Sequence, residues 1–337
     1  MGTKSGGAEA CSVAETTLPQ LGELWRCGGS GLEWDCLFVL PPWLEAWVET
    51  LGKGGTPLLG TVRQGRRLLG VAPLRREGDR AWFLGSPDVC DYQDFVVARD
   101  AATAAPAFCR ALLGHLAEIG VRRLELGALR PEAAAARFLP DAAEAAGWEV
   151  AWAPDGAAVE LDLPATWEAF LGGLDKKERH EVRRKLRRLD RAGPVRYRRA
   201  APGEAAGKGA ERFLELFAGY RKDKASFLTP EREAFFRRLL AATAREGLAE
   251  LAFLEVAGEP VAGILCFFYR GTTYLYNNGY DPSWEHLSVG FASKVWSIRE
   301  SIARGARRYD LLKGDEAYKL RLGGRRVPLV RCLLTRR

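Results

Sequence analysis

The chain has 337 residues, of which 47% are hydrophobic, and a formal net charge of +7; its length exceeds the roughly 250–300 residues of a single core, so two domains are expected. Seven cysteines without a Cys-x-x-Cys pair and three scattered histidines argue against a disulfide framework, a zinc site and a Ser-His-Asp hydrolase, so reduced thiols and no metal are expected. The chain shows neither an apolar span long enough for a bilayer nor the apolar core of a signal peptide, which favours a cytoplasmic location.

From the N-terminus, the sequence predicts a disordered tail over residues 1–20, rich in Gly, Ala, Thr and Ser. The elements expected next are a helix over 41–51, a hairpin of strands over 57–62 and 67–74, strands over 82–84 and 94–97, a helix over 104–119 and a strand over 121–126. Two strands over 148–152 and 159–163, separated by a Pro-Asp-Gly turn, complete this half.

A long basic helix over 166–192, stopped by Gly193-Pro194, opens the second half. The elements expected after it are helices over 211–220 and 231–245, a hairpin over 249–256 and 261–269, a strand over 272–277, a helix over 287–303, a strand over 309–312 and a last strand over 327–334. The helix over 287–303 carries an apolar stripe of Phe291, Val295, Ile298 and Ile302.

The two halves resemble each other. Residues 120–126 (GVRRLEL) align with residues 305–311 (GARRYDL) without a gap, and each half has the order hairpin, strand, loop, helix, strand. Such self-similarity indicates a duplication, and we expect two α/β domains over residues 21–163 and 164–337. The first half lacks the charged turn that follows Leu312 in the second, so we interpret the first domain as a degenerate copy.

Residues 305–324 (GARRYDLLKGDEAYKLRLGG) place ionisable groups where a buried strand ends. Ligands bind at strand ends in open α/β sheets, so Asp310, Asp315, Tyr318 and Lys319 are candidate catalytic residues. Asp310 can act as a base or orient Lys319, Tyr318 can act as a general acid, and Lys319 can neutralise an oxyanion or a phosphate. A lysine in a cleft is expected to tolerate alanine with little loss of stability. The alternative interpretation is a solvated, charged loop.

The positive charge comes from one segment. Residues 175–199 hold twelve Lys or Arg and four Asp or Glu, a balance of +8, so the other residues sum to −1. This excess predicts an anionic partner for the basic helix, with Arg183 and Arg184 as contacts; CoA phosphates, a tRNA acceptor stem and an anionic membrane surface all fit, and a solvated face is the alternative. The start of the helix near Ser288 and Gly290 can bind a pyrophosphate, or it is an ordinary N-cap.

Three segments of the second half resemble the CelD-like (cellulose-biosynthesis-type) GNAT acetyltransferases. They are KKERHEVRR at 176–184, YLYNNGYD at 274–281, and Tyr309-Asp310 leading to GDEAYK at 314–319. The resemblance covers about residues 165–325. The Tyr318-Lys319 pair before Gly323-Gly324 is also distantly similar to the Fem-type aminoacyl-tRNA-dependent transferases, which have tandem GNAT-like domains. Only Ser288-x-Gly290 stands where ordinary GNATs have a glycine-rich pyrophosphate loop.

The resemblance implies a fold of two tandem GNAT-like domains, each a mixed sheet flanked by helices. It implies an acyltransferase that moves an acyl group from acyl-CoA, foremost acetyl-CoA, to an amine or hydroxyl of a small molecule or glycan. The donor would contact Ser288, Gly290, Arg183 and Arg184, and a backbone N–H near Asn278 would polarise the acyl carbonyl. The alternatives are a Fem-type transferase that uses aminoacyl-tRNA and a non-catalytic binding module.

Overall fold

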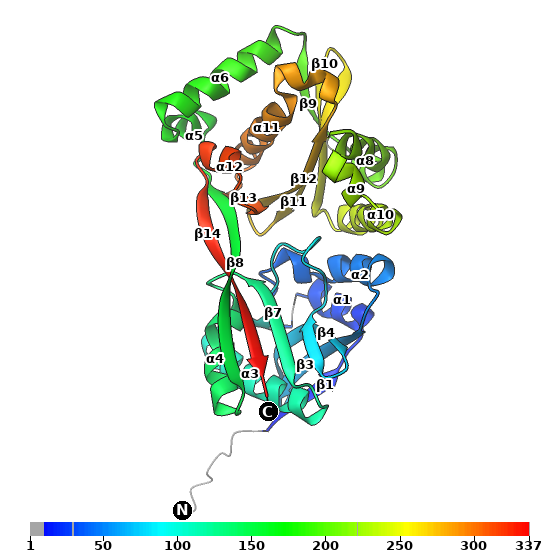
Figure 1. Ribbon diagram of the computed structural model, residues 1–337, viewed down its shortest axis with the longest axis vertical. Helices are drawn as coiled ribbons and strands as arrows, with labels where there is room; N and C mark the ends of the chain where they lie inside the picture. Colours follow the sequence, from blue (N-terminus) through cyan, green and yellow to red (C-terminus); the bar gives the residue numbers. More distant parts are fainter. Residues whose placement is uncertain (1–9, 29, 221, 337) are drawn as a thin grey trace, which may run out of the picture. The chain divides into compact units, whose positions relative to one another are not determined.

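The computed structural model describes residues 10–28, 30–220 and 222–336, and it divides into two compact units (Figure 1). Unit 1 comprises Met1–Val48, Gly52–Gly156 and Pro328–Arg337, and unit 2 comprises Glu49–Leu51 and Ala157–Val327. The first nine residues of the tail predicted over 1–20 lie outside the described residues. The rest of that segment is folded instead: residues 11–15 form a strand that pairs with residues 60–64, and a helix begins at residue 18.

Unit 1 is a mixed sheet covered by helices. Its elements are β1 (Cys11–Glu15), α1 (Leu18–Arg26), β2 (Leu32–Glu33), η1 (Leu37–Val39), α2 (Pro41–Thr50), β3 (Thr56–Gln64), β4 (Arg67–Glu77), β5 (Arg80–Phe83), β6 (Val96–Ala98), α3 (Ala101–Glu118), β7 (Arg123–Leu129), α4 (Ala134–Ala145) and the last part of β14 (Arg325–Thr335). The strand order is β1-β3-β4-β5-β7-β14. Phe108 and Leu112 of α3 belong to one buried cluster with Val62 and Leu74 of the sheet.

Unit 2 is a second mixed sheet with helices on both faces. Its elements are the end of β8 (Glu149–Asp162), α5 (Trp167–Gly173), α6 (Lys176–Asp190), β9 (Val195–Arg199), α7 (Pro202–Ala205), α8 (Lys208–Tyr220), α9 (Lys222–Phe227), α10 (Pro230–Arg245), β10 (Ala249–Val256), β11 (Glu259–Tyr269), β12 (Thr272–Tyr280), η2 (Pro282–Leu287), α11 (Val289–Ala303), β13 (Arg308–Lys313) and α12 (Ala317–Arg321). Helices α8, α9 and α10 lie on one face, and α5, α6 and α11 on the other (Figure 1). Helix α8 comes so close to β12 that a Cβ on Gly279 would lie 2.4 Å from Cα of Phe217, so this position requires glycine.

Both units have the same strand order and the same strand directions. The order in unit 2 is β9-β10-β11-β12-β13-β8, and β12 and β13 run parallel as β5 and β7 do in unit 1. The remaining neighbours along each order are antiparallel. The sequence repeat matches this topology, because Arg123 begins β7 and Arg308 begins β13, each three residues after a glycine with positive φ.

The closing strand of each sheet crosses from one unit into the other. Strand β8 follows α4 of unit 1, and its residues 158–162 pair with β13 of unit 2. Strand β14 follows α12 of unit 2, and its residues 330–335 pair with β7 of unit 1. The contacts therefore assign residues 328–337 to unit 1, whereas the sequence places them in the second domain. Hydropathy patterns reveal a strand but not the sheet that it joins.

Two predicted elements have different bounds in the structure. The basic helix expected over 166–192 is two helices, because α5 ends at Gly173 and Asp175 caps α6 by accepting the N–H of Glu178 at 3.0 Å. The two strands expected over 148–152 and 159–163 are one long strand, β8. Its Asp155 does not turn the chain but accepts the N–H of Ala128 at 2.6 Å and pairs with Arg331 at 3.2 Å. None of the described helices is long and apolar enough to cross a bilayer.

Candidate active site

Strands β12 and β13 run side by side for only a short distance. They pair over three positions, of which the last is Tyr274 opposite Asp310. Strand β12 then continues along β11 as far as Tyr280, with a register shift between Leu265 and Cys266 of β11. The two strands therefore part after Tyr274, and the residues of β12 beyond it, including Asn278, no longer pair with β13.

The turn after β13 is organised around the ammonium group of Lys319. Leu312 and Gly314 have positive φ angles of 62° and 103°, and this conformation directs the carbonyl groups of residues 312–314 towards Lys319. Nζ of Lys319 donates to the carbonyl oxygens of Leu312, Lys313 and Gly314 at 3.3, 2.8 and 3.0 Å, and it lies 2.9 Å from Oε2 of Glu316. The side chain is only 3% exposed. Its three hydrogens thus have four protein acceptors.

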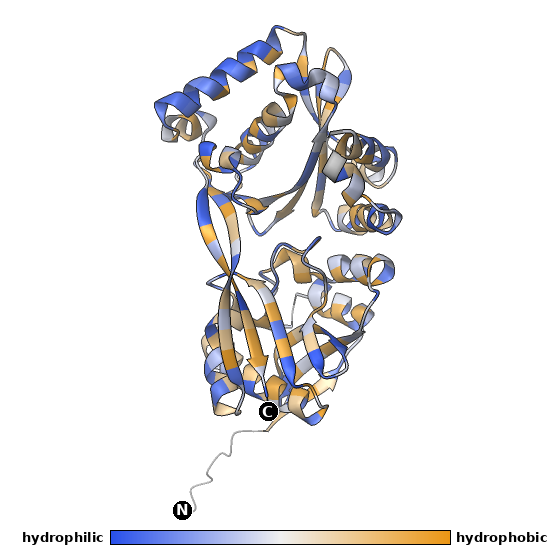
Figure 2. Ribbon diagram, in the orientation of Figure 1, coloured by the Kyte–Doolittle hydropathy of each residue, from blue (hydrophilic) through white to orange (hydrophobic). Residues whose placement is uncertain are grey.

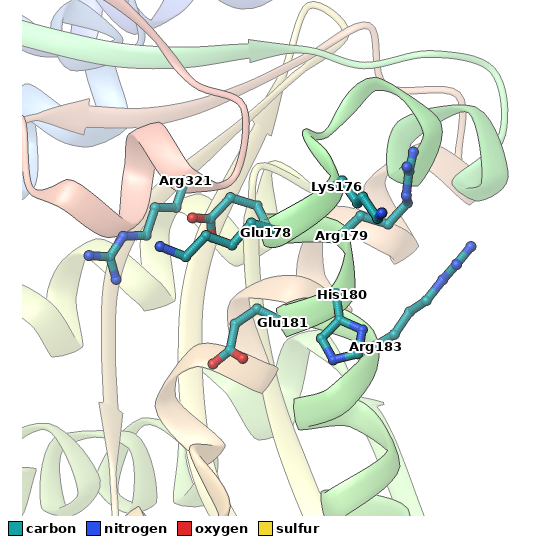
Figure 3. A pocket seen from close by; sticks show the side chains of 8 residues that line it. Lys176, Glu178, Arg179, His180, Glu181, Arg183 and Arg321 are labelled. Carbon is teal, nitrogen blue, oxygen red and sulfur yellow. The ribbon is translucent and has the colours of Figure 1, made fainter.

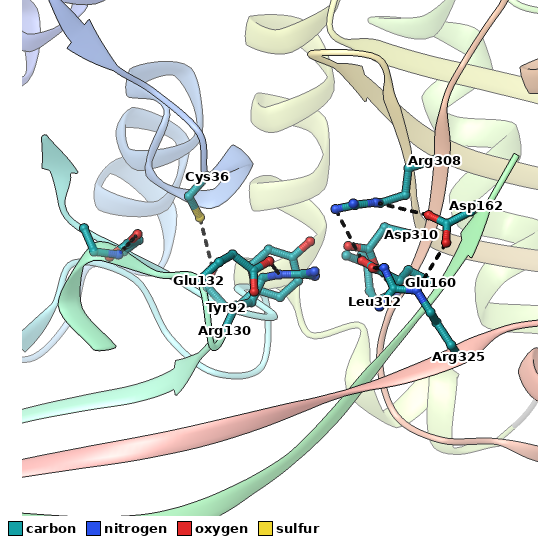
Figure 4. A network of polar contacts seen from close by, with 12 residues as sticks. Cys36, Tyr92, Arg130, Glu132, Glu160, Asp162, Arg308, Asp310, Leu312 and Arg325 are labelled. Carbon is teal, nitrogen blue, oxygen red and sulfur yellow. Dashed lines mark hydrogen bonds and ion pairs between the residues drawn. The ribbon is translucent and has the colours of Figure 1, made fainter. Parts of the chain in front are cut away.

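Asp310 is buried among paired carboxylates at the start of this turn. It is 1% exposed, and its Oδ1 accepts the backbone N–H of the residue two positions later at 2.8 Å. Across the ladder it faces Glu160 of β8, which is also buried and is bound by Arg325 and, at 3.6 Å, by Arg308 (Figure 4). The same two arginines bind Asp162 at 3.4 and 4.0 Å. Two arginines thus balance the carboxylates of β8.

A second buried lysine, Lys294 of α11, lies beside Tyr318. Its Nζ is 5.0 Å from the centre of the Tyr318 ring and donates to the carbonyl oxygen of Gly290 at 2.8 Å. The side chain is 8% exposed. Burial lowers the pKa of Lys294 to about 7, while Glu316 opposes this shift and Lys224 and Lys319 add to it. Lys294 therefore exchanges a proton near neutral pH.

The start of α11 is closed by two neighbouring side chains. Ser288 has a φ of 58°, and Arg188 of α6 donates to its Oγ at 3.2 Å and to the carbonyl oxygen of His286. A Cβ on Gly290 would lie 2.5 Å from the ring of Tyr280, so this ring fills the space that the glycine leaves. Within the described part of the chain, the first two amides of α11 have no hydrogen-bond acceptor.

An open groove of about 910 Å³ follows the basic side of α6 (Figure 3). Most residues of α6 are hydrophilic by hydropathy (Figure 2), and its buried residues are Val182 and Leu189. Arg183 lines the groove, whereas Arg184 pairs with Glu181 through two bonds of 2.8 Å and thereby lowers the pKa of Glu181 to about 2. The residues that line the groove are Lys176, Lys177, Glu178, Arg179, His180, Glu181, Arg183 and, from α12, Arg321.

The buried thiols do not contribute a nucleophile here. All seven cysteines are free, and Cys90, Cys109, Cys266 and Cys332 are buried. Burial raises the pKa of each of these four thiols to about 12, so they stay protonated at neutral pH. Acyl transfer at this site would then proceed without a covalent intermediate on any of the four.

The family described as "Acetyltransferase (GNAT) domain" matches residues 176–320, which run from α6 to α12. Unit 2 contains a GNAT acetyltransferase domain. The protein is therefore an enzyme of the GNAT acyltransferase type. Comparison with curated protein sequences finds no match.

Solved structures extend the likeness to the whole chain. FemX is 13% identical, with a TM-score of 0.67 over 95% of this chain and 96% of its own. The C-terminal domain of a protein named as a lysylphosphatidylglycerol synthetase from Agrobacterium fabrum is 11% identical, with a TM-score of 0.56 over 86% and 90%. L-PGS from Bacillus licheniformis is 16% identical, with a TM-score of 0.52 over 87% and 90%. At such identities the likeness concerns the fold, and it confirms the expected class of two tandem GNAT-like domains.

Within the GNAT domain, the structure brings some of the predicted residues together and separates others. Tyr318, Lys319 and Asp310 lie around one turn, but Asp315 is exposed and pairs with Arg326 at 3.5 Å. Arg183 lines the groove, whereas Arg184 is bound to Glu181.

Sequence reasoning missed Lys294, although a signal was present. This residue lies three positions after Phe291 and four before Ile298, on the apolar stripe of its helix. A lone lysine on an apolar helix face is uncommon and indicates a buried amine.

Proposed function

We propose that the GNAT domain moves an acyl group, foremost acetyl, from acyl-CoA to an amine or hydroxyl of a small molecule or glycan. The observation that carries this proposal is the parting of β12 and β13 in a domain that also buries a lysine with a pKa near 7 beside Tyr318. A backbone N–H of β12 beyond its pairing with β13 can polarise an acyl carbonyl, and the neutral amine of Lys294 can accept a proton. We also propose that the enzyme is of the CelD-like type and that it acts in the cytoplasm.

The phosphates of the donor have two groups of partners in this domain. The two free amides at the start of α11 can bind one phosphate, although Arg188 already holds the hydroxyl of Ser288 and Tyr280 fills the space above Gly290. The larger share of positive charge lies along the groove of α6. Arg183 is the predicted contact that lines this groove. These residues are therefore more suited to binding the phosphates of the donor along the groove than to enclosing a pyrophosphate in a narrow loop at the start of α11.

A second candidate, transfer from aminoacyl-tRNA, is favoured by the length of this charged surface. Basic residues lie on the groove from Lys176 to Arg183, about two helical turns, and Arg321 adds another from α12. A run of phosphates along an RNA backbone would contact more of these side chains than one nucleotide would, and its affinity would fall more steeply with salt.

The test compares the two donors on the full chain. Radiolabelled acetyl-CoA and a mixture of radiolabelled aminoacyl-tRNAs are incubated with the protein and a panel of amines, amino sugars and sugars. We expect label on an acceptor with one donor only. Label from aminoacyl-tRNA alone would replace the first candidate with the second. Saturable binding without any transfer from either donor would refute the proposed activity and favour a binding module.

A further inference from the structure

Two buried lysines from different helices lie near Tyr318, and they differ in the number of hydrogen-bond acceptors around Nζ. Lys319 of α12 has four oxygen acceptors for its three hydrogens. Lys294 of α11, as far as the described residues show, has only one acceptor, the carbonyl oxygen of Gly290. An ammonium group carries three hydrogens, so the charged form of Lys294 would leave two of them without an oxygen partner.

The charges around Lys294 also disfavour its protonated form. The charged groups that act on it are Lys224 of α9, and Lys319 and Glu316 from the turn and helix α12. Its Nζ also lies 5.0 Å from the centre of the uncharged ring of Tyr318. Two cations and one anion do not compensate a further buried positive charge. Geometry and charge therefore agree that Lys294 holds an unprotonated amine, with a free lone pair, near neutral pH.

We propose that Lys294 is the proton acceptor in the acyl-transfer step, an inference that rests on the proposed acyltransferase activity. The acceptor amine or hydroxyl attacks the acyl carbonyl carbon, and its proton passes to Nζ of Lys294. The new carbon–nitrogen or carbon–oxygen bond forms as the bond from the acyl carbon to the sulfur or oxygen of the carrier breaks. The ammonium of Lys294 then gives its proton to that leaving atom, and the carrier departs as a thiol or an alcohol. The amine is regenerated, and no other reactant is needed.

In this scheme Lys319 has a different task. Its Nζ is bonded to the carbonyl groups of the turn, and Lys319 thereby keeps Tyr318 in place beside Lys294. Lys319 is then a positioning residue, whereas Lys294 would touch the acceptor. The assignment moves the base away from Asp310, whose carboxylate is bonded inside the turn.

The experiment measures kcat/KM against pH for the full chain, with the donor that gives transfer, acetyl-CoA or aminoacyl-tRNA. The wild type should show a rising limb with an apparent pKa near 7. Lys294→Met should lose roughly 100- to 10,000-fold in turnover together with this limb. Lys294→Arg, which stays charged, should be equally inactive. Lys208→Met, an exposed lysine of α8 outside the site, serves as the matched control.

A structural role for Lys294 gives a different result. Donor affinity and the thermal unfolding midpoint are measured for each variant, and ¹³C-lysine spectra of the wild type are titrated, with Lys294→Met used to assign the resonance. An assigned Lys294 resonance that titrates near pH 10, or a Lys294→Met or Lys294→Arg variant that keeps the rising limb, overturns the proposal. Failure of the wild type to transfer label from either donor is a separate result, because it refutes the acyltransferase activity itself.

Discussion

Replacement of Lys319 by alanine should destabilise the protein strongly, contrary to what its sequence position predicts. The substitution removes the donor for three carbonyl groups, of residues 312, 313 and 314, in a turn that already holds Leu312 at a positive φ. A buried acceptor left without a partner costs about 1–3 kcal/mol, and water can reach the two carbonyls that are only partly buried, so we assign about 2 kcal/mol to the turn. The three lost methylene groups add about 2 kcal/mol at ~0.8 each. The exposed partner Glu316 adds little.

The expected loss in the free energy of unfolding is therefore about 4 kcal/mol, which lowers Tm by roughly 10 °C in a domain of this size. Urea and thermal unfolding followed by circular dichroism provide the measurement, and limited proteolysis at residues 312–324 reports the local effect. Lys319→Met keeps the apolar stem and should lose about half as much. Lys208→Ala should change stability by less than about 0.5 kcal/mol. A Lys319→Ala protein that melts within about 2 °C of the wild type would refute this account of the turn.

Three further predictions concern neighbouring residues. Lys294→Met should stabilise the protein at pH 7 and below. The free energy of unfolding of the wild type should rise by about 3 kcal/mol between pH 7 and about 9.5, because the unfolded lysine keeps its proton over this range while the native one has lost it. Lys294→Met should lack this rise, and urea midpoints at several pH values provide the measurement. Gly290→Ala should cost about 1–3 kcal/mol through its contact with the ring of Tyr280, and a smaller side chain at position 280 should recover most of the loss in thermal melts. Arg183→Glu should weaken donor binding and flatten its dependence on salt in titration calorimetry, whereas Arg184→Gln should have a smaller effect because Glu181 already neutralises that arginine.

The sequence was sufficient for the elements whose pattern is local. The aligned segments at 120–126 and 305–311 identify two strands that begin at equivalent arginines and two glycines with positive φ. Hydrophobic periodicity likewise located the hairpins of both units, because alternation along a strand does not depend on distant residues. The charged stretch after β13 was also recognised as a place where several ionisable groups meet.

The chemistry of the individual side chains could not be predicted in this way. The sequence suggests that Lys319 lies in a cleft. In the folded chain its Nζ is instead bonded to three carbonyl groups of the turn, and these point towards it only once the turn has formed. The pKa of Lys294 is lowered mainly by burial, which exists only in the folded chain. The helical pattern over 166–192 is continuous in the sequence, so it does not show that the helix is interrupted before Asp175. The interruption depends on whether the carboxylate of Asp175 caps a new helix or stays solvated.

The exchange of closing strands has a consequence for anyone who wishes to dissect the protein. A fragment that ends after α4 would lack the β14 edge that covers β7, and a fragment that starts at α5 would lack the β8 edge that covers β13. Each truncated piece would expose a row of unpaired backbone groups and would tend to aggregate or to recruit a foreign strand. The first unit therefore cannot be expressed as one continuous fragment, because it needs residues 328–337 as well as the residues up to 156. A fragment that begins before β8 keeps the strand that covers β13, and it should be the soluble form of the GNAT domain.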